Sequence, residues 1–170
     1  MYLYLLDVSH NAVTTGYLHN FCETLLENLD KIPGDSRTQI GFITYNSSLH
    51  FYNLSDSLQQ PRMMMYPDLE EVILPMPDNL MVNLNENRQS IQVFLQSLPS
   101  MFADSYETDS ALGTALNAAY QLLKHTGGRI TIMQTCLPNL GVGSLKPREE
   151  NIDKVKKKGF LILKLTETGF

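Results

Sequence analysis

The segment Asp7-Val8-Ser9-His10-Asn11 has the residue types and spacing that most clearly suggest chemistry. It follows Tyr2-Leu3-Tyr4-Leu5-Leu6, a near-continuous apolar run typical of a buried parallel strand. Carboxylate and hydroxyl oxygens are suitable ligands for a hard cation, so Asp7 and Ser9 form a candidate cation site. Open α/β sheets place their binding sites at the carboxyl ends of strands, where this turn is expected.

Two further polar segments are expected at the same edge of the sheet. Thr108-Asp109-Ser110 precedes a predicted helix, and Gln134-Thr135 follows a predicted strand. Gln134-Thr135 carries no acid, so a divalent cation would be bound by one carboxylate and a few hydroxyl groups. Protein sites that bind divalent cations tightly use more anionic ligands. We therefore expect Asp7 and Ser9 to make turn and helix-cap hydrogen bonds instead of binding a metal.

An enzymatic role for Asp7 is a third alternative. An aspartate at the end of a first strand could act as a phosphotransferase nucleophile, but such enzymes carry a second acid two residues on, where this chain has Ser9. No glycine-rich phosphate loop follows a strand, and no activated Ser or Cys nucleophile can be assigned. The histidines fall on separate predicted elements, at positions 10, 19, 50 and 125. The chain is therefore predicted not to be an enzyme, and a small α/β hydrolase or phosphatase stays the third alternative.

Strands and helices must position these loops. Runs rich in β-branched and aromatic residues predict strands at residues 2–7, 38–45, 49–54 and 129–135. Apolar stripes at helical spacing predict helices at residues 12–30, 86–98 and 111–124. Pro99 is expected to stop the second helix and Ser110 to cap the third. The predicted fold class is α/β, a mostly parallel sheet with helices on both faces and residues 49–54 as an antiparallel edge strand.

Residues 56–84 differ in composition from the rest of the chain. They contain half of the eight prolines, at positions 61, 67, 75 and 77, and the methionine run at residues 63–65. The segment is expected to be a long connection with short extended pieces such as residues 71–74. Long loops of this size usually carry function or bind a partner, so a plain surface connection and a binding loop are both open.

Composition narrows the class of protein. The 170 residues, 43% apolar and 18% charged, are enough for about one domain with its own core. The net charge of −5 argues against nucleic acid as the main partner. Cys22 and Cys136 form no CxxC pair and are expected to be core residues or reduced thiols. Without a signal peptide or an apolar run of about 20 residues, the expectation is a soluble cytosolic domain.

The three polar loops together resemble the metal site of a von Willebrand A-type domain. That family uses an Asp-x-Ser-x-Ser motif, a threonine before a Gly-x-Ala-Leu stretch, and an aspartate after the fourth strand. Here Asp7, Ser9 and Asn11 occupy the first motif, Ser110 lies near the threonine position, and no acid follows the fourth strand. The resemblance implies a degenerate cation site at Asp7, Ser9, Asn11 and Ser110, which we expect not to bind metal. A metal-dependent protein-binding module of this type is the alternative function.

Many separate segments narrow the resemblance further. They are DVSHNAV (7–13), LLENLDKIPGDSR (25–37), IGF (40–42), HFYNL (50–54), LPMPD (74–78), VNL (82–84), SALG (110–113), TGGR (126–129) and LPNLG (137–141). Together they resemble the trunk domain of the cargo-adaptor subunit of the COPII coat, the Sec24 family. The resemblance covers about residues 1–150.

This resemblance implies a von Willebrand A-like trunk within a larger coat protein that selects cargo for transport from the endoplasmic reticulum to the Golgi. The implied protein partners are the sister COPII subunit, which is bound through the trunk domains, and cargo export signals, including those of SNARE proteins. The full coat would also contact the endoplasmic reticulum membrane. Nucleic acid is not an implied partner. The implied location is cytoplasmic, peripheral on endoplasmic reticulum exit sites and COPII vesicles. Zinc belongs to the family's zinc-ribbon module, whose cysteine pairs do not occur here, so no cofactor is expected in this segment.

The resemblance stops near Glu150. Residues 1–150 are therefore expected to form an incomplete, C-terminally truncated trunk domain, followed by a divergent tail at residues 151–170. The tail is either a divergent or alternatively spliced end or an artefact of the gene model, and residues 160–165 have strand character. In each case the sheet would lack strands and expose an unpaired edge, which favours association.

Overall fold

Strand β1 (Tyr2–Asp7) lies between two parallel neighbours, β2 (Gln39–Tyr45) and β6 (Arg129–Met133), as its apolar run predicts. The computed structural model describes residues 1–55, 60–146 and 164–165. Within them, the main sheet has the order β4-β3-β2-β1-β6, and β5 also pairs with β2. The remaining strands of this sheet are β3 (Leu49–Asn53), β4 (Arg62–Tyr66) and β5 (Val82–Asn83).

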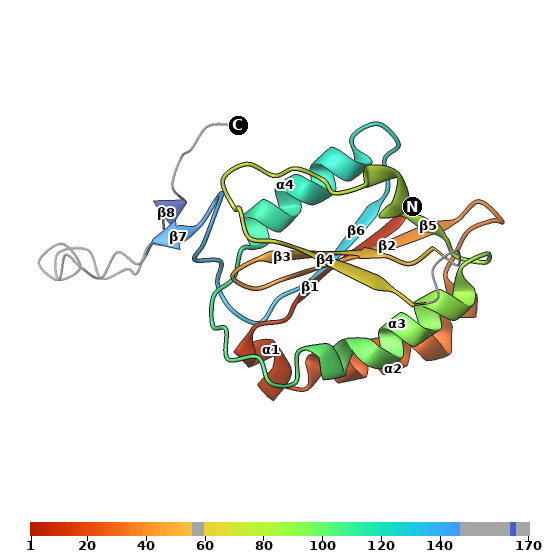
Figure 1. Ribbon diagram of the computed structural model, residues 1–170, viewed down its shortest axis with the longest axis horizontal. Helices are drawn as coiled ribbons and strands as arrows, with labels where there is room; N and C mark the ends of the chain where they lie inside the picture. Colours follow the sequence, from red (N-terminus) through yellow and green to blue (C-terminus); the bar gives the residue numbers. More distant parts are fainter. Residues whose placement is uncertain (56–59, 147–163, 166–170) are drawn as a thin grey trace, which may run out of the picture.

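Helices cover both faces of this sheet, as predicted (Figure 1). The helices α1 (His10–Thr14), α2 (Tyr17–Asn28) and α3 (Arg88–Met101) lie on one face, and α4 (Leu112–Leu123) lies on the other. Short 3-10 turns η1 (Leu29–Lys31) and η2 (Pro77–Asn79) and a small ladder of β7 (Leu145–Lys146) with β8 (Lys164–Leu165) complete the described elements. None of the helices in the described ranges is long and apolar enough to span a bilayer.

Each face of the sheet has its own hydrophobic core because side chains alternate along a strand. Leu6 of β1 packs with α2 and α3, whereas Leu3 and Leu5 pack with α4. In the first core, the Phe94 ring lies 5.0 Å from the Phe42 ring and 4.5 Å from the Tyr52 ring, centroid to centroid. Such tilted aromatic contacts add about 0.5–1.5 kcal/mol to the burial of the rings themselves.

The prediction of a mostly parallel sheet is wrong, because the sheet is mixed. The pairings β2–β3, β2–β5 and β3–β4 are antiparallel, and only β1–β2 and β1–β6 are parallel among the described strands. The cause lies in residues 56–84: their methionine run forms β4, which pairs with β3, so that β3 is not an edge strand. Residues 71–74 form no strand; instead Val72 is buried in the core under α4.

Three expectations about the helices also need correction. The predicted helix at 12–30 is broken at Gly16, whose φ of 70° is the left-handed conformation that glycine tolerates, so α1 and α2 are separate. Pro99 does not stop α3, which continues to Met101, and the buried Leu98 and Phe102 hold this last turn in the core. Ser110 does not cap α4: Ala111 is the N-cap residue, and no side chain bonds to the helix end.

The strand predicted at residues 160–165 lies mostly outside the described residues. Only Lys164 and Leu165, which form β8, are described there. The other four predicted strands are confirmed, with bounds that differ by two residues at most.

Candidate functional site

The carboxyl ends of β1 and β6 meet at one edge of the sheet, because the two strands are parallel neighbours. Asp7 ends β1, and Thr135 and Cys136 lie just beyond Gln134, the residue that follows β6. Asp7, Ser9 and Ser110 are fully buried. Asn11 is exposed on α1. The structure therefore brings three of the four predicted site residues into this edge and leaves Asn11 outside it.

The Asp7 carboxylate is surrounded by protein hydrogen-bond donors. Its Oδ1 atom accepts a bond from the backbone N–H of Ser9 at 2.8 Å, which closes an Asx-type turn. Its Oδ2 atom accepts bonds from the backbone N–H of Thr135 at 2.9 Å and from the Thr135 hydroxyl at 2.7 Å. The Cys136 thiol approaches the same oxygen at 3.5 Å. The carboxylate thus ties the end of β1 to the start of α1 and to the chain after β6.

The predicted turn bond of Asp7 is confirmed, but the predicted helix-cap bond of Ser9 is wrong. Ser9 is the N-cap residue of α1, yet its hydroxyl makes no capping bond. The Ser9 Oγ atom instead lies 3.4 Å from Thr135 Oγ1 and 3.7 Å from the Cys136 sulfur. The hydroxyl faces the β6 side of the site because Thr135, in the place of an acid, offers it a partner there.

Ser110 joins the site through its backbone. Its N–H donates to Asn139 Oδ1 at 2.8 Å, and its carbonyl accepts bonds from the N–H groups of Asn139 and Leu140 at 3.1 and 3.2 Å. The Ser110 hydroxyl is the one fully buried side-chain oxygen or nitrogen without a hydrogen bond in the described part of the chain. It lies close enough to Cys136 to influence the pKa of that thiol, but it forms no bond of good geometry.

The ionisable side chains around Asp7 are held neutral. The Tyr17 hydroxyl donates to the Asp7 carbonyl, and the Tyr45 hydroxyl donates to the Met133 carbonyl at 3.0 Å. Burial, and then the nearby Asp7 carboxylate, raise the pKa of both phenols above the ordinary value. Burial also raises the pKa of the Cys136 thiol. A raised pKa disfavours the thiolate, so Cys136 lacks the activation that a nucleophilic cysteine needs.

The stretch Gly113-Thr114-Ala115-Leu116 positions the loop after β6. A Cβ atom on Gly113 would lie 1.7 Å from the Val142 carbonyl oxygen, so only glycine allows this close approach. The Thr114 hydroxyl donates to the Leu69 carbonyl at 3.2 Å and accepts from the Val142 N–H at 3.3 Å. These residues act as packing and hydrogen-bonding groups that bring three chain segments together.

Sequence reasoning missed two participants in this edge, Cys136 and Asn139. Cys136 was expected to be a core residue or a reduced thiol, and it is indeed a free, partly buried thiol; only its place beside Asp7 was not predicted. Asn139 donates from Nδ2 to Asp109 at 2.6 Å while its Oδ1 accepts from Ser110. An asparagine within a Pro/Gly loop is a residue type that organises turns, and that signal could have identified it.

The residues of this edge do not fit a divalent cation. Asp7 supplies the one buried carboxylate of the described residues, and backbone and hydroxyl donors occupy both of its oxygens. Nowhere in the described ranges do three His, Cys, Asp or Glu side chains gather in a way that could hold a metal ion. N–H and O–H groups that point at a carboxylate occupy the positions that a cation would need.

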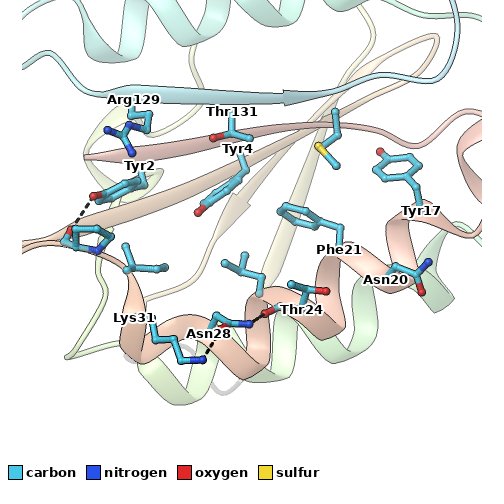
Figure 2. Close-up of a pocket in the computed structure, with 14 residues that line it drawn as sticks. Tyr2, Tyr4, Tyr17, Asn20, Phe21, Thr24, Asn28, Lys31, Arg129 and Thr131 are labelled. Carbon is cyan, nitrogen blue, oxygen red and sulfur yellow. Dashed lines mark hydrogen bonds between the residues drawn. The ribbon is translucent and has the colours of Figure 1, made fainter.

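A separate groove of about 640 Å³ lies between α2 and the β1–β6 part of the sheet (Figure 2). Tyr2 and Tyr4 of β1 and Arg129 and Thr131 of β6 point into it, opposite Phe21 and the polar residues of α2 (Figure 2). The Tyr2 hydroxyl donates to the Pro33 carbonyl at 2.7 Å, and the Arg129 guanidinium lies 5.8 Å from the centre of the Tyr2 ring. The groove has aromatic rings from β1 and α2 beside amide and hydroxyl groups of α2.

Comparison with known proteins agrees with this architecture. The family model of the Sec23/Sec24 trunk domain matches residues 1–161. The chain is 57% identical over 150 residues to the protein transport protein Sec24A of Homo sapiens, and 48% identical over 151 residues to the protein transport protein SEC24 A of Arabidopsis thaliana. These matches cover 88% and 89% of this chain, but 14% of each relative's length.

A solved structure shows the same relationship at the level of the fold. The crystal structure of the human COPII-coat protein Sec24c superposes with a TM-score of 0.81 at 37% identity. The match covers 87% of this chain and 21% of the Sec24c chain. The family model, the curated relatives and the solved structure thus agree over the same part of the chain, and this protein belongs to the Sec23/Sec24 trunk-domain family.

Proposed function

We propose that this chain serves as trunk-domain sequence of a Sec24-type cargo-adaptor subunit of the COPII vesicle coat. The observation that carries the proposal is the match of the family model to residues 1–161, together with 57% identity to human Sec24A. The chain spans about a seventh of the length of those relatives. The function of a whole adaptor is therefore proposed for the protein that contains this chain. The finer description of the domain, a von Willebrand A-like trunk, belongs to the same proposal.

The proposed partners follow from this function. One is the sister COPII subunit, which is bound through the trunk domains. The others are cargo export signals, including those of SNARE proteins, and the endoplasmic reticulum membrane, which the assembled coat contacts. The proposed location is cytoplasmic and peripheral, on endoplasmic reticulum exit sites and COPII vesicles. We further propose that residues 1–150 are the trunk part of the chain and residues 151–170 a divergent tail.

The geometry of the carboxyl edge supports a structural role for these residues over a catalytic or metal-binding role. Protein donors already occupy the Asp7 carboxylate, and Cys136 has a raised pKa. We propose that Asp7, Ser9, Asn11 and Ser110 bind no metal and that this segment uses no cofactor. In this proposal, Asp7, Ser9 and Ser110 fix the loops at one edge of the sheet.

Affinity capture from cytosol tests the proposed function. The tagged full-length gene product is expected to recover the sister coat subunit, identified by mass spectrometry. The same bait carrying Asp7→Ala should recover less of it, because the carboxylate joins three segments of the trunk, whereas a bait carrying the exposed Asp35→Ala should recover it fully. Recovery of no coat subunit by a folded wild-type bait would contradict the proposal.

A further inference from the structure

The loop between α3 and α4 carries a tyrosine that takes no part in the sheet, the two cores or the carboxyl edge. Residues 105–111 form neither helix nor strand, and both flanks of this loop are described, α3 on one side and α4 on the other. Tyr106 keeps 82% of its surface exposed, the largest fraction among the exposed apolar and aromatic side chains of the described residues. A packing role does not explain a side chain with so little contact.

One face of the Tyr106 ring lies against His10, the first residue of α1. The two rings are nearly parallel, and their centroids are 5.8 Å apart. His10 also holds the backbone on both sides of the tyrosine, because its N–H donates to the Glu107 carbonyl at 2.6 Å and its Nδ1 donates to the Ser105 carbonyl at 3.1 Å. The loop therefore runs past α1 in a fixed position, and the ring extends from it into solvent (Figure 1).

The Tyr106 hydroxyl makes no hydrogen bond in the described part of the chain, which distinguishes it from most of the eight tyrosines. The hydroxyl groups that do form such bonds belong to Tyr2, Tyr17, Tyr45, Tyr52 and Tyr66. Of the other two, Tyr4 is half-buried in the groove beside α2, and Tyr120 is exposed on α4. Tyr106 thus combines a free hydroxyl, high exposure and irregular backbone.

Acidic residues flank Tyr106 closely. Asp104, Glu107 and Asp109 all lie within three positions of it, and residues 89–123 contain no lysine or arginine. A kinase cleft that binds an acidic segment carries basic side chains, and charge patterns of this kind determine which substrates a kinase accepts. The charge around Tyr106 therefore suits a kinase with a basic substrate cleft.

We propose that Tyr106 is a phosphorylation site for a tyrosine kinase whose substrate cleft is basic. The Tyr106 hydroxyl oxygen attacks the γ-phosphorus of Mg²⁺-bound ATP, and a new oxygen–phosphorus bond forms as the bond to the bridging oxygen of ADP breaks. ADP leaves, and the phenol proton passes to the catalytic aspartate of the kinase. The loop suits this in-line transfer because its tyrosine can enter a cleft without the unfolding of a helix or a strand.

The phosphate would place a switchable charge beside the carboxyl edge of the sheet. A phosphorylated tyrosine carries a charge of about −1.5 to −2 at pH 7. The loop is tied to this edge because Asp109 accepts a bond from Asn139 and the Glu107 carbonyl accepts one from α1. Tyr106 makes none of the bonds that hold Asp7. Phosphorylation therefore changes the charge that the edge presents and leaves its buried hydrogen bonds in place.

Phosphorylation of the complete 170-residue chain in vitro tests the site. The probe is the catalytic domain of a tyrosine kinase that prefers a glutamate–tyrosine copolymer as its substrate, and peptide mass spectrometry measures the phosphate at each tyrosine. Tyr106 should react about tenfold faster than the matched control Tyr120, which is 66% exposed but lies on a helix with no acid within three residues. Tyr106→Phe, which keeps a ring on His10, should remove most of the early product. Equal rates at the two tyrosines would overturn the assignment.

Neutralising the flanking acids tests the proposed class of kinase. Asp104→Asn with Glu107→Gln leaves Asp109 and its bond in place, and it should slow the reaction at Tyr106 by about tenfold. The rate at Tyr120 should stay the same, and circular dichroism establishes that the variant is folded. An unchanged rate at Tyr106 in a folded variant would overturn recognition through a basic cleft.

The gene product isolated from its own cells shows whether the site is used. Cells treated with vanadate, which inhibits tyrosine phosphatases, should yield the peptide that contains Tyr106 with a phosphate on this residue. Recovery of that peptide in the unmodified form alone would overturn the proposal. The measurement concerns one residue and not the assembly of a coat, so its failure would leave the proposed function untouched.

Discussion

Replacing Asp7 with alanine removes the carboxylate that connects the end of β1 with the turn before α1 and the segment after β6. The side chain is fully buried, and its two oxygens accept bonds from the Ser9 N–H, the Thr135 N–H and the Thr135 hydroxyl. Alanine offers none of these acceptors. The variant is therefore expected to unfold at a lower denaturant concentration than the wild type.

The size of the loss follows from the donors left without a partner. A buried donor without its acceptor costs about 1–3 kcal/mol. The Thr135 hydroxyl can turn toward Ser9 Oγ, which lies 3.4 Å away, so the cost falls mainly on the two backbone N–H groups. Their sum predicts a loss of about 2–6 kcal/mol for Asp7→Ala. Asp7→Asn keeps an oxygen for Ser9 and should lose about half as much, because one backbone N–H then faces an amide NH₂ group.

Urea unfolding followed by far-ultraviolet circular dichroism measures these differences, since the chain has no tryptophan. The control is Asp35→Ala, whose carboxylate forms an exposed pair with Arg37 and whose loss should leave the midpoint unchanged. Adding Mg²⁺ or Mn²⁺ in the millimolar range should not move the wild-type midpoint, because a ligand stabilises only a protein that binds it.

Two results would refute this account of the carboxyl edge. One is an Asp7→Ala variant that unfolds within about 1 kcal/mol of the wild type, which would mean that the hydrogen bonds of the carboxylate are replaced easily. The other is stabilisation of the wild type by Mg²⁺ or Mn²⁺ that disappears in Asp7→Ala. That result would favour a metal-dependent binding module.

Three further changes probe the rest of the fold. Burial lowers the pKa of His50 from 6.5 to about 4, so the unfolded chain binds the proton first as the pH falls. The free energy of unfolding should therefore fall by up to about 3 kcal/mol between pH 6.5 and 4. Urea titrations over this pH range should show a smaller fall for His50→Gln. Phe94→Ala should cost about 3–5 kcal/mol through the cavity it leaves, whereas the neighbouring exposed Val93→Ala should cost under about 0.5 kcal/mol in the same assay; equal losses would contradict the core assignment. Gly113→Ala should destabilise the chain by about 1–3 kcal/mol and raise hydrogen exchange near Val142, because the added methyl group collides with that carbonyl; unchanged exchange would argue against the contact.

The core elements of the fold could be predicted from sequence because their periodicities are strong. The buried run of β1, the strands β2, β3 and β6, and the apolar stripes of the helices all gave the right element type. The methionine run of β4 was not recognised, because prolines on both sides suggested a loop and methionine has no marked strand preference. Together with the unpredicted antiparallel pairing of β5 with β2, that omission explains why the sheet was predicted to be mostly parallel although it is mixed.

The candidate site was predictable in position but not in detail. Parallel strands place the ends of β1 and β6 together, so Asp7 and the segment after Met133 were expected to meet. Where the Ser9 hydroxyl points, and how Asn139 organises Ser110 and Asp109, depend on the path of loops that carry no periodic signal. The Asn11 side chain was placed by analogy with a metal-binding motif, and the structure leaves it at the surface.

Direct binding between purified full-length gene product and the purified sister coat subunit tests the central claim, that this chain is trunk sequence of a COPII cargo adaptor. Sedimentation of the two proteins together is expected to show a complex with one copy of each. Asp7→Ala in the full-length protein should weaken that complex, and Asp35→Ala should not. Two folded proteins that sediment separately at micromolar concentration would contradict the claim.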